Sequence, residues 1–144
     1  MAGKNNSNLC RTFDMGELKT YKYVVVFSKF QGKLMLSRHK SRDTWETQGG
    51  HIEPGETPEL AAQRELWEES GAEEFTLTPV CGYLAADESS EAAGAVFFAE
   101  ISKMGRLPES EMAEVKLFPT LPENVTYPGI TPLLFQRVEG YFQK

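Results

Sequence analysis

Three glutamates near the middle of the chain have a spacing suited to holding a cation. Glu65, Glu68 and Glu69 lie in the segment RELWEES, at relative positions i, i+3 and i+4. This spacing puts three carboxylates on one face of a helix, where each like-charged pair costs roughly 0.2–0.5 kcal/mol. The arrangement is unfavourable unless a positive charge compensates it, so it predicts a cation site. A solvated acidic face is the ordinary alternative.

The segment that precedes these glutamates supports a cation site. Glu56 adds a fourth carboxylate, and the loop GGHIEPGE holds three glycines, which can bring backbone carbonyls close to an ion. Hard cations such as Mg²⁺ take oxygen ligands and are usually shared with substrate phosphates. Zinc is disfavoured because His39 and His51 are the only histidines and the cysteines lie elsewhere in the chain. The donor types therefore favour Mg²⁺.

The elements that must position these carboxylates follow from local patterns. Thr57 and Pro58 predict a helix start, because threonine caps free N–H groups and proline suits the first helical position. Gly71 predicts that this helix ends at about Ser70. A second helix is expected over residues 133–144, where apolar residues recur at helical spacing. The expected strands are rich in β-branched and aromatic residues, and they are 21–30, 33–38, 75–86, 93–102 and 115–118.

This order of elements predicts an α+β fold, an α/β/α sandwich with a mixed β-sheet between helices. The 144 residues are expected to form a single domain, with the polar residues 1–12 as a flexible tail. No apolar run approaches the roughly 18 residues of a membrane helix, and the N-terminus lacks a secretory signal. Cys10 and Cys81 show no metal or redox spacing and are expected to be free thiols. These features predict a cytoplasmic protein.

The charge balance narrows the class of partner. A formal net charge of −6 disfavours duplex nucleic acid, because that affinity comes mainly from lysine and arginine. We therefore expect a small-molecule nucleotide as the partner, no membrane, and a monomer or homodimer. The basic run SRHKSR, residues 37–42, precedes the acidic stretch. It is either an anion-binding segment or a solvated loop.

The acidic stretch also resembles the Nudix family. Residues 50–72 match the pattern G-x5-E-x7-R-E-U-x-E-E-x-G-U, in which U is aliphatic, at every fixed position. So many identities at set spacing, within a strand–loop–helix context, make a specific match. Two departures stand out: Gln48 replaces the proline that many relatives carry before the paired glycines, and Ala72 replaces a larger aliphatic residue. Neither departure removes a ligand.

The resemblance implies hydrolysis of a nucleoside diphosphate linked to another group, with Mg²⁺ or Mn²⁺ as cofactor. The implied metal ligands are Glu65, Glu68, Glu69 and the carbonyl of Gly49. The implied structural residues are Gly50, Glu56 and Gly71. Arg64 is implied to steady the loop through Glu56, and Arg38 to bind phosphate. The implied catalytic residues are Glu65, Glu69, Arg64 and Glu111, with either Glu65 or Glu111 as general base and Glu114 as the second choice in the later loop.

The substrate is predicted from residues outside the motif and from resemblance to particular members of the family. The segment DESSE, which follows the motif, lacks the proline or tyrosine typical of relatives that act on ADP-ribose or dinucleoside polyphosphates. The chain looks more like MutT-type nucleoside triphosphate diphosphatases, which act on oxidised purine nucleotides such as 8-oxo-dGTP. Asn124 is either the residue that reads the purine or a turn asparagine. The aromatic residues that could stack on a base or lie in the core are Phe27, Phe97, Phe98 and Tyr127.

Other functions stay open at this level. Within the enzyme class, the chain could hydrolyse another nucleoside diphosphate derivative or act as an mRNA 5′-end pyrophosphohydrolase. A non-catalytic nucleotide-sensing module would keep the fold without turnover, but it would not need the full set of glutamates. A purely structural acidic helix would show no metal dependence.

Overall fold

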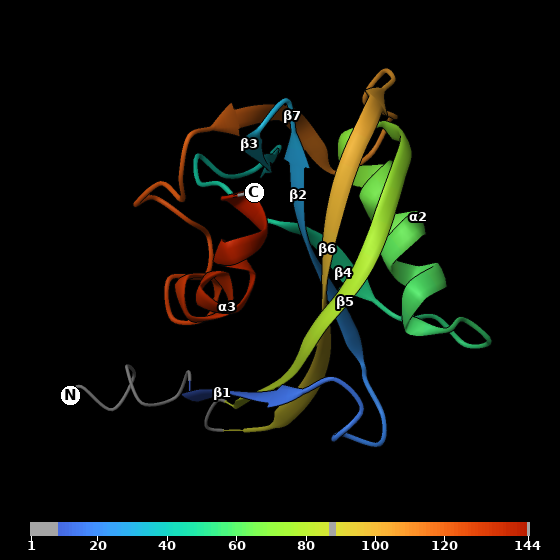
Figure 1. Ribbon diagram of the computed structural model, residues 1–144, viewed down its shortest axis with the longest axis vertical. Helices are drawn as coiled ribbons and strands as arrows, with labels where there is room; N and C mark the ends of the chain where they lie inside the picture. Colours follow the sequence, from blue (N-terminus) through green and yellow to red (C-terminus); the bar gives the residue numbers. More distant parts are fainter. Residues whose placement is uncertain (1–8, 87–88, 144) are drawn as a thin grey trace.

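One mixed β-sheet forms the centre of the molecule (Figure 1). The computed structural model describes residues 9–86 and 89–143. The strand order is β1-β5-β6-β2-β3-β7, and β4 pairs with β2 outside this path. The β2–β6 pair is parallel, whereas the other pairs are antiparallel. The strands are β1 (Leu9–Asp14), β2 (Tyr23–Phe30), β3 (Lys33–His39), β4 (Gln48–His51), β5 (Ala72–Ala86), β6 (Glu91–Met104) and β7 (Met112–Phe118).

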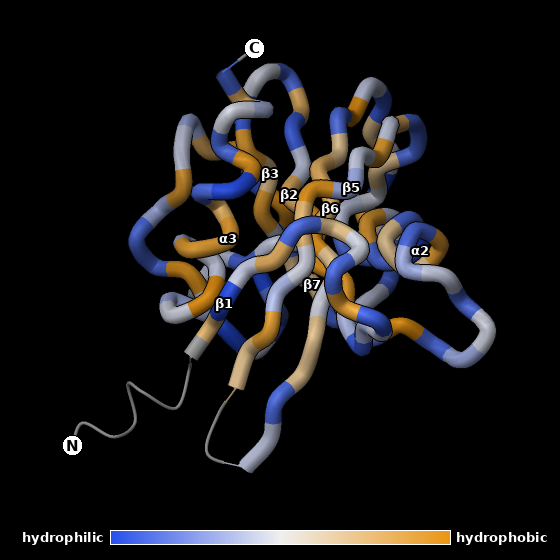
Figure 2. The backbone as a smooth tube through the Cα atoms, turned by 60° about the horizontal axis from the view of Figure 1, so that its bottom comes forward, coloured by the Kyte–Doolittle hydropathy of each residue, from blue (hydrophilic) through white to orange (hydrophobic). Residues whose placement is uncertain are grey.

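Helices cover both faces of this sheet. Helix α2 (Pro58–Ser70) packs on one face, while α3 (Thr131–Val138) and the 3-10 turn η1 (Glu139–Phe142) cover the other (Figure 1). Each face has its own core, and hydrophobic stretches run along the central strands (Figure 2). Leu66 of α2 and Leu134 of α3 are buried in these two cores. The predicted α/β/α arrangement is therefore confirmed.

The predicted limits of α2 are confirmed. The Thr57 side chain accepts a hydrogen bond from the Leu60 N–H at 3.2 Å, which satisfies one free donor of the first turn. Gly71 ends the helix with φ of 86°, and its N–H donates to the Trp67 carbonyl at 2.8 Å. A Cβ at Gly71 would lie 2.6 Å from the Arg106 carbonyl oxygen, so this position requires glycine for both conformation and space.

Two strands were not expected from the sequence, and both depend on tertiary pairing. Residues 9–12, predicted as part of a flexible tail, belong to β1, which pairs with β5 from Leu9↔Ala86 to Asp14↔Cys81. The tail prediction is wrong there, while residues 1–8 lie outside the described residues. Strand β4 is only four residues long and includes two glycines, so its composition gives no strand signal.

The remaining boundaries differ modestly from those expected. Strands β5 and β6 extend three and two residues beyond the predicted starts, at Ala72 and Glu91. Asp87 and Glu88 of the segment DESSE lie outside the described residues. The closing helix is divided into α3 and η1. Over the part of the chain that the structure describes, no helix is long and apolar enough to cross a membrane.

Candidate active site

Strand β4 brings the paired glycines against the acidic face of α2. It pairs with β2 through Val25↔Gly49 and Val24↔Gly50, and the loop after it leads directly into α2. A Cβ at Gly50 would collide with the carboxylate of Glu65. The Glu65 carboxylate therefore occupies the space that a side chain at position 50 would fill.

Glu69 is held at the end of the same helical face. The Gly49 N–H donates a hydrogen bond to Glu69 Oε1 at 2.9 Å. Burial raises the pKa of Glu69 to about 8, and the negative charges of Glu65, Glu46 and Glu111 act in the same direction. Without a cation, this carboxyl group keeps its proton at neutral pH. A bound cation would favour the ionised form.

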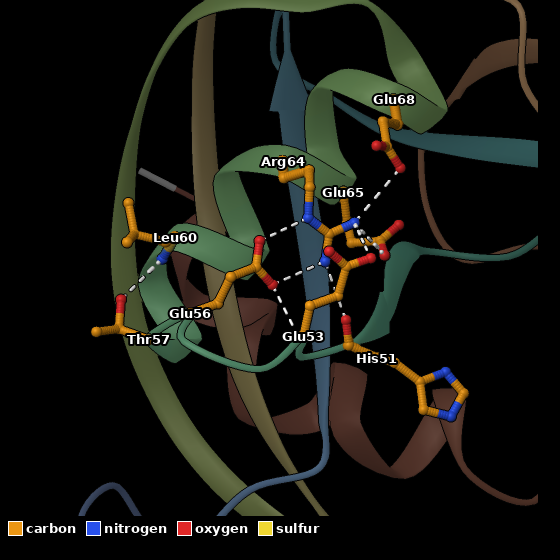
Figure 3. Close-up of polar contacts among 8 residues, drawn as sticks. All are labelled: His51, Glu53, Glu56, Thr57, Leu60, Arg64, Glu65 and Glu68. Carbon is orange, nitrogen blue, oxygen red and sulfur yellow. Dashed lines mark hydrogen bonds and ion pairs between the residues drawn. The ribbon is translucent and has the colours of Figure 1, made fainter.

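Arg64 fastens the loop before the helix to α2 (Figure 3). Its Nε and Nη2 donate to the two oxygens of Glu56 at 2.6 and 2.9 Å, and Nη2 also donates to the His51 carbonyl at 3.0 Å. The hydrogen bond from Arg64 is the main reason that the pKa of Glu56 falls to about 2. This two-point contact matches the supporting role expected for the pair.

The guanidinium group of Arg64 also faces the carboxylates of α2 (Figure 3). Its Nη1 lies 3.0 Å from Glu65 Oε2 and 3.5 Å from Glu68 Oε1. Glu65 is 9% exposed, and burial raises its pKa despite the opposing effect of Arg64. Arg64 thus supplies part of the positive charge that three neighbouring carboxylates need.

The donor chemistry of this face fits a hard cation. Glu65, Glu68, Glu69 and the Gly49 carbonyl would offer only oxygen atoms, and the Glu69 side chain is largely withdrawn from water. Among residues 9–86 and 89–143, no three His, Cys, Asp or Glu side chains are already gathered around one point. Because Arg64 engages Glu65 and Glu68, a cation would compete with the guanidinium group for these oxygens.

A cleft of about 730 Å³ opens beside Glu69. It is lined by Gly49, Gly50 and Glu69, by residues of β2, β5 and β6, and by residues of α3 and of the segment before it. Its polar lining includes Tyr83 of β5, Tyr127 of the segment before α3, and, from other segments, His39, Arg42, Glu46 and Glu111. Its volume is in the range of small-molecule sites.

Glu111 lies at this cleft, as its predicted role requires. Its side chain is 81% exposed, and Oε1 lies 3.9 Å from His39 Nε2. The second choice, Glu114, is not among the residues that line the cleft and instead pairs with Arg38 at 3.0 Å. The geometry therefore favours Glu111 over Glu114.

Two residues predicted to bind substrate do not line the cleft. Arg38 lies opposite Glu114 in the β3–β7 pair, and its Nη1 donates to the Arg42 carbonyl at 3.0 Å, so its charge is used within the protein. Asn124 is exposed, and its side chain donates to the Asp43 carbonyl at 3.4 Å. Its backbone carbonyl accepts a hydrogen bond from Trp45. The Asn124 side chain therefore contacts a distant loop and not its own turn, and it is not among the residues that line the cleft.

Other polar residues of the cleft were not predicted from the sequence as site residues. Glu46 is 8% exposed and accepts hydrogen bonds from Arg42 Nη1 at 3.2 Å and from Thr126 Oγ1 at 2.9 Å. The basic run at residues 37–42 contained Arg42, but nothing local distinguished it from Arg38. Of the aromatic candidates, Tyr127 lines the cleft and is 49% exposed, whereas the three phenylalanines are buried.

Comparison with known proteins identifies the family. The NUDIX domain pattern matches residues 20–124, which is most of the chain. The chain belongs to the Nudix family. The YtkD protein of Bacillus subtilis, named provisionally as an 8-oxo-dGTP diphosphatase, is 35% identical over 108 residues, covering 73% of this chain and 66% of YtkD. The RNA pyrophosphohydrolase of Yersinia pestis is 43% identical over 47 residues, covering 33% of this chain and 27% of that protein.

Solved Nudix structures show the same fold. The Bacillus subtilis pyrophosphohydrolase BsRppH superposes with a TM-score of 0.79 at 26% identity, covering 93% of this chain and 92% of that chain. A UDP-X diphosphatase superposes with a TM-score of 0.66 at 23% identity, covering 88% of this chain and 66% of that chain. The chain thus spans less than two thirds of the length of the two curated relatives, but nearly all of the BsRppH chain.

Proposed function

We propose that this protein is a divalent-metal-dependent pyrophosphohydrolase that converts nucleoside triphosphates to monophosphates and pyrophosphate. The observation that carries the proposal is the placement of Glu69, which is held by the Gly49 N–H and opens onto a cleft of about 730 Å³. Glu65 lies beside it against Gly50, within a complete Nudix motif. A nucleotide-sensing module would have no need for all of these carboxylates.

Mg²⁺ or Mn²⁺ would be held by Glu65, Glu68 and Glu69, with the Gly49 carbonyl as a further donor. Such an ion neutralises polyphosphate charge and lowers the pKa of bound water. The protein's own residues fix the positions of these ligands. Arg64 holds the loop at Glu56 and the carboxylates of the helix in one place, which keeps the ligand face and the glycine turn in register.

Glu111 is our proposed general base. Glu111 lines the cleft with an 81% exposed side chain, and its ion-pair partner among the described residues is His39 at 3.9 Å and not an arginine, so it can accept a proton from water near the substrate. Glu65 is the alternative, but it is buried and lies 3.0 Å from Arg64. Comparing E111Q with E65Q would separate these roles.

An oxidised purine nucleotide such as 8-oxo-dGTP is the substrate we propose. The name of YtkD supports this choice, since that relative shares 35% identity over 108 residues. Tyr127 offers an exposed ring at the cleft on which a base could stack. Arg42 lines the same cleft, and its Nη1 donates to Glu46 Oε1 at 3.2 Å. We propose Arg42 in place of Arg38 as the residue that contacts phosphate, because Arg38 does not line the cleft.

The 5′ end of RNA is the second candidate substrate. The observation in its favour is the similarity to RNA pyrophosphohydrolases, which is confined to 47 residues. The net charge of −6 opposes it, because a long polyanion would be repelled. A mononucleotide carries fewer charges, so the net charge of −6 opposes its binding less.

The experiment is a measurement of pyrophosphate and orthophosphate release from several substrates. The panel is 8-oxo-dGTP, dGTP, ATP, ADP-ribose and a short 5′-triphosphorylated RNA, each with Mg²⁺, with Mn²⁺ or with a chelator. We expect metal-dependent pyrophosphate release, fastest with 8-oxo-dGTP. Faster release from RNA would replace the proposed substrate with the second candidate. Nucleotide binding without turnover under any condition would contradict the enzymatic function.

A further inference from the structure

A cluster of buried polar side chains lies beneath the glycine turn of the site. Gln48, Ser28 and Ser37 each have 0% exposure. Burying polar groups is unfavourable unless each one finds a hydrogen-bond partner, and no described buried side-chain nitrogen or oxygen lacks one. Gln48 directly precedes Gly49, at the position where many relatives carry proline. Proline could not make the contacts that the Gln48 amide makes here.

The hydrogen bonds fix the orientation of the Gln48 amide. Ser28 Oγ donates to Gln48 Oε1 at 2.6 Å, and Gln48 Nε2 donates to the Met35 carbonyl at 3.3 Å and to Ser37 Oγ at 3.0 Å. The reversed amide would place Oε1 against the Met35 carbonyl, and two acceptors cannot pair. The side chain therefore presents an N–H group to Ser37.

This N–H group determines where the Ser37 proton goes. Because Ser37 Oγ accepts from Gln48, its single proton is free to donate, and it donates to the Glu69 carbonyl at 2.8 Å. That carbonyl belongs to the last turn of α2, where backbone acceptors have no partner within the helix. Since the Gly49 N–H also holds the Glu69 carboxylate, both ends of this residue are fixed by neighbouring parts of the sheet.

We propose that Ser37 is a positioning residue, which acts through its hydrogen bond to the Glu69 carbonyl and is itself oriented by Gln48. The link holds the last turn of α2 against β3 and so sets where the Glu69 carboxylate lies relative to Gly49. Its effect on turnover rests on the proposed function, whereas its effect on local structure does not. Partners that orient ligand side chains typically change activity or metal affinity by roughly 10–100-fold when removed.

Ser28 provides a matched control for Ser37. Both serines are fully buried, and both contact the Gln48 amide, but the described hydrogen bonds of Ser28 go only to Gln48 and Met35. Replacing either serine with alanine deletes one buried hydroxyl group. Both S37A and S28A should therefore lose some thermal stability. Only S37A deletes a contact to α2.

The test measures turnover and hydrogen exchange in both variants. We expect S37A to lower kcat by about 10–100-fold with KM within about threefold, while S28A keeps both within about threefold. The exchange rate of the Gly49 amide, which reports on its bond to Glu69, should rise by about tenfold or more in S37A and stay near the wild-type rate in S28A. S37T, which keeps a hydroxyl group, should restore much of the lost turnover.

Exchange and turnover separate the two proposals. If wild-type protein shows no metal-dependent hydrolysis, the proposed function fails, and the Gly49 exchange rate alone decides whether Ser37 positions Glu69. Equal Gly49 exchange in S37A and S28A would overturn the inference. If S37A does not fold, S37C replaces it, because a thiol is similar in size to a hydroxyl group but is a weak donor to the Glu69 carbonyl. An unchanged Gly49 exchange rate in S37C would also overturn the inference.

Discussion

Two glutamates of the site have opposite electrostatic environments. Glu56 accepts two hydrogen bonds from Arg64, and its pKa falls to about 2, so it is ionised throughout the neutral range. Burial raises the pKa of Glu69 to about 8. The first residue has a permanent partner within the protein. The second stays protonated and neutral at neutral pH, and a bound cation would favour its ionised form, as expected for a metal ligand.

The raised pKa of Glu69 predicts how the metal-free protein responds to pH. The ordinary pKa of a glutamate is 4.5, so the unfolded state loses this proton near pH 4.5 and the folded state loses it near pH 8. Between these two pH values the folded state holds a proton that the unfolded state has released. The free energy of unfolding should therefore fall as the pH rises through this window. Thermal melts of wild-type protein in chelator should show this fall, and E69Q should show less of it. Identical pH profiles would contradict the assignment.

Two glycines of the motif should respond differently to alanine. At Gly50 a Cβ would displace the end of the flexible Glu65 side chain, so G50A should fold but lose most turnover. At Gly71 the φ of 86° and the nearby Arg106 carbonyl are backbone constraints, so G71A should lose about 1–3 kcal/mol of stability. Denaturant titrations and kcat measurements would check both. Similar stability losses in the two variants would contradict this distinction.

The sequence predicted the residues of the motif better than those of the cleft. Fixed spacing on one helix determines that Glu65, Glu68 and Glu69 share a face, because helical geometry is local. The partners of Arg38 and Asn124 depend on strand register and loop packing. Arg38 meets Glu114 across the β3–β7 pair, more than seventy residues later in the chain, which local composition could not reveal.

At the level of elements, the Arg64–Glu56 ion pair holds the loop between β4 and α2 against the helix. Glu56 bonds both Arg64 and the Glu53 N–H, so it closes the loop on itself and ties it to the helix. Glu53 is also near Arg64, but its oxygen lies 3.9 Å away and its side chain is 62% exposed. The two glutamates therefore have similar charge and location but very different contacts.

This difference gives a paired prediction. E56Q should loosen the loop, because a neutral amide replaces a carboxylate that accepts two hydrogen bonds from the guanidinium group. We expect faster amide exchange over residues 51–57 and a roughly tenfold or greater loss of turnover, whereas E53Q should resemble wild type. Exchange measured by mass spectrometry would check the first effect. Equal behaviour of the two variants would mean that Glu56 has no special structural role.

Helix α2 and the long strands were predictable because their signals are local, namely a threonine cap, a terminal glycine and runs of β-branched and aromatic residues. The strands β1 and β4 were not. Strand β1 forms because it pairs with the edge of β5. Strand β4 forms because Gly49 and Gly50 pair with β2. Such pairing depends on distant residues and overrides local preference.

At the scale of the whole molecule, the fold brings three separate segments to one cleft. Gly49 comes from β4, Glu69 from α2, and Glu111 from the segment before β7. This cleft is also lined by Tyr127 and by three residues that follow it, Ile130, Thr131 and Leu134. Glu69 thus lies at the edge of a cavity, whereas Glu65 and Glu68 are not among the residues that line it. Under the proposed function, Glu69 would meet the cations that accompany a phosphate ligand at this cleft.

The most direct test of this account measures Mg²⁺-dependent pyrophosphate release by wild-type protein, E69Q and E59Q. Glu59 is an exposed carboxylate in the first turn of the same helix and does not line the cleft, so E59Q controls for the loss of one charge. We expect E69Q to fold and to lose at least about 100-fold in kcat, with E59Q close to wild type. Wild-type rates in folded E69Q would contradict the account.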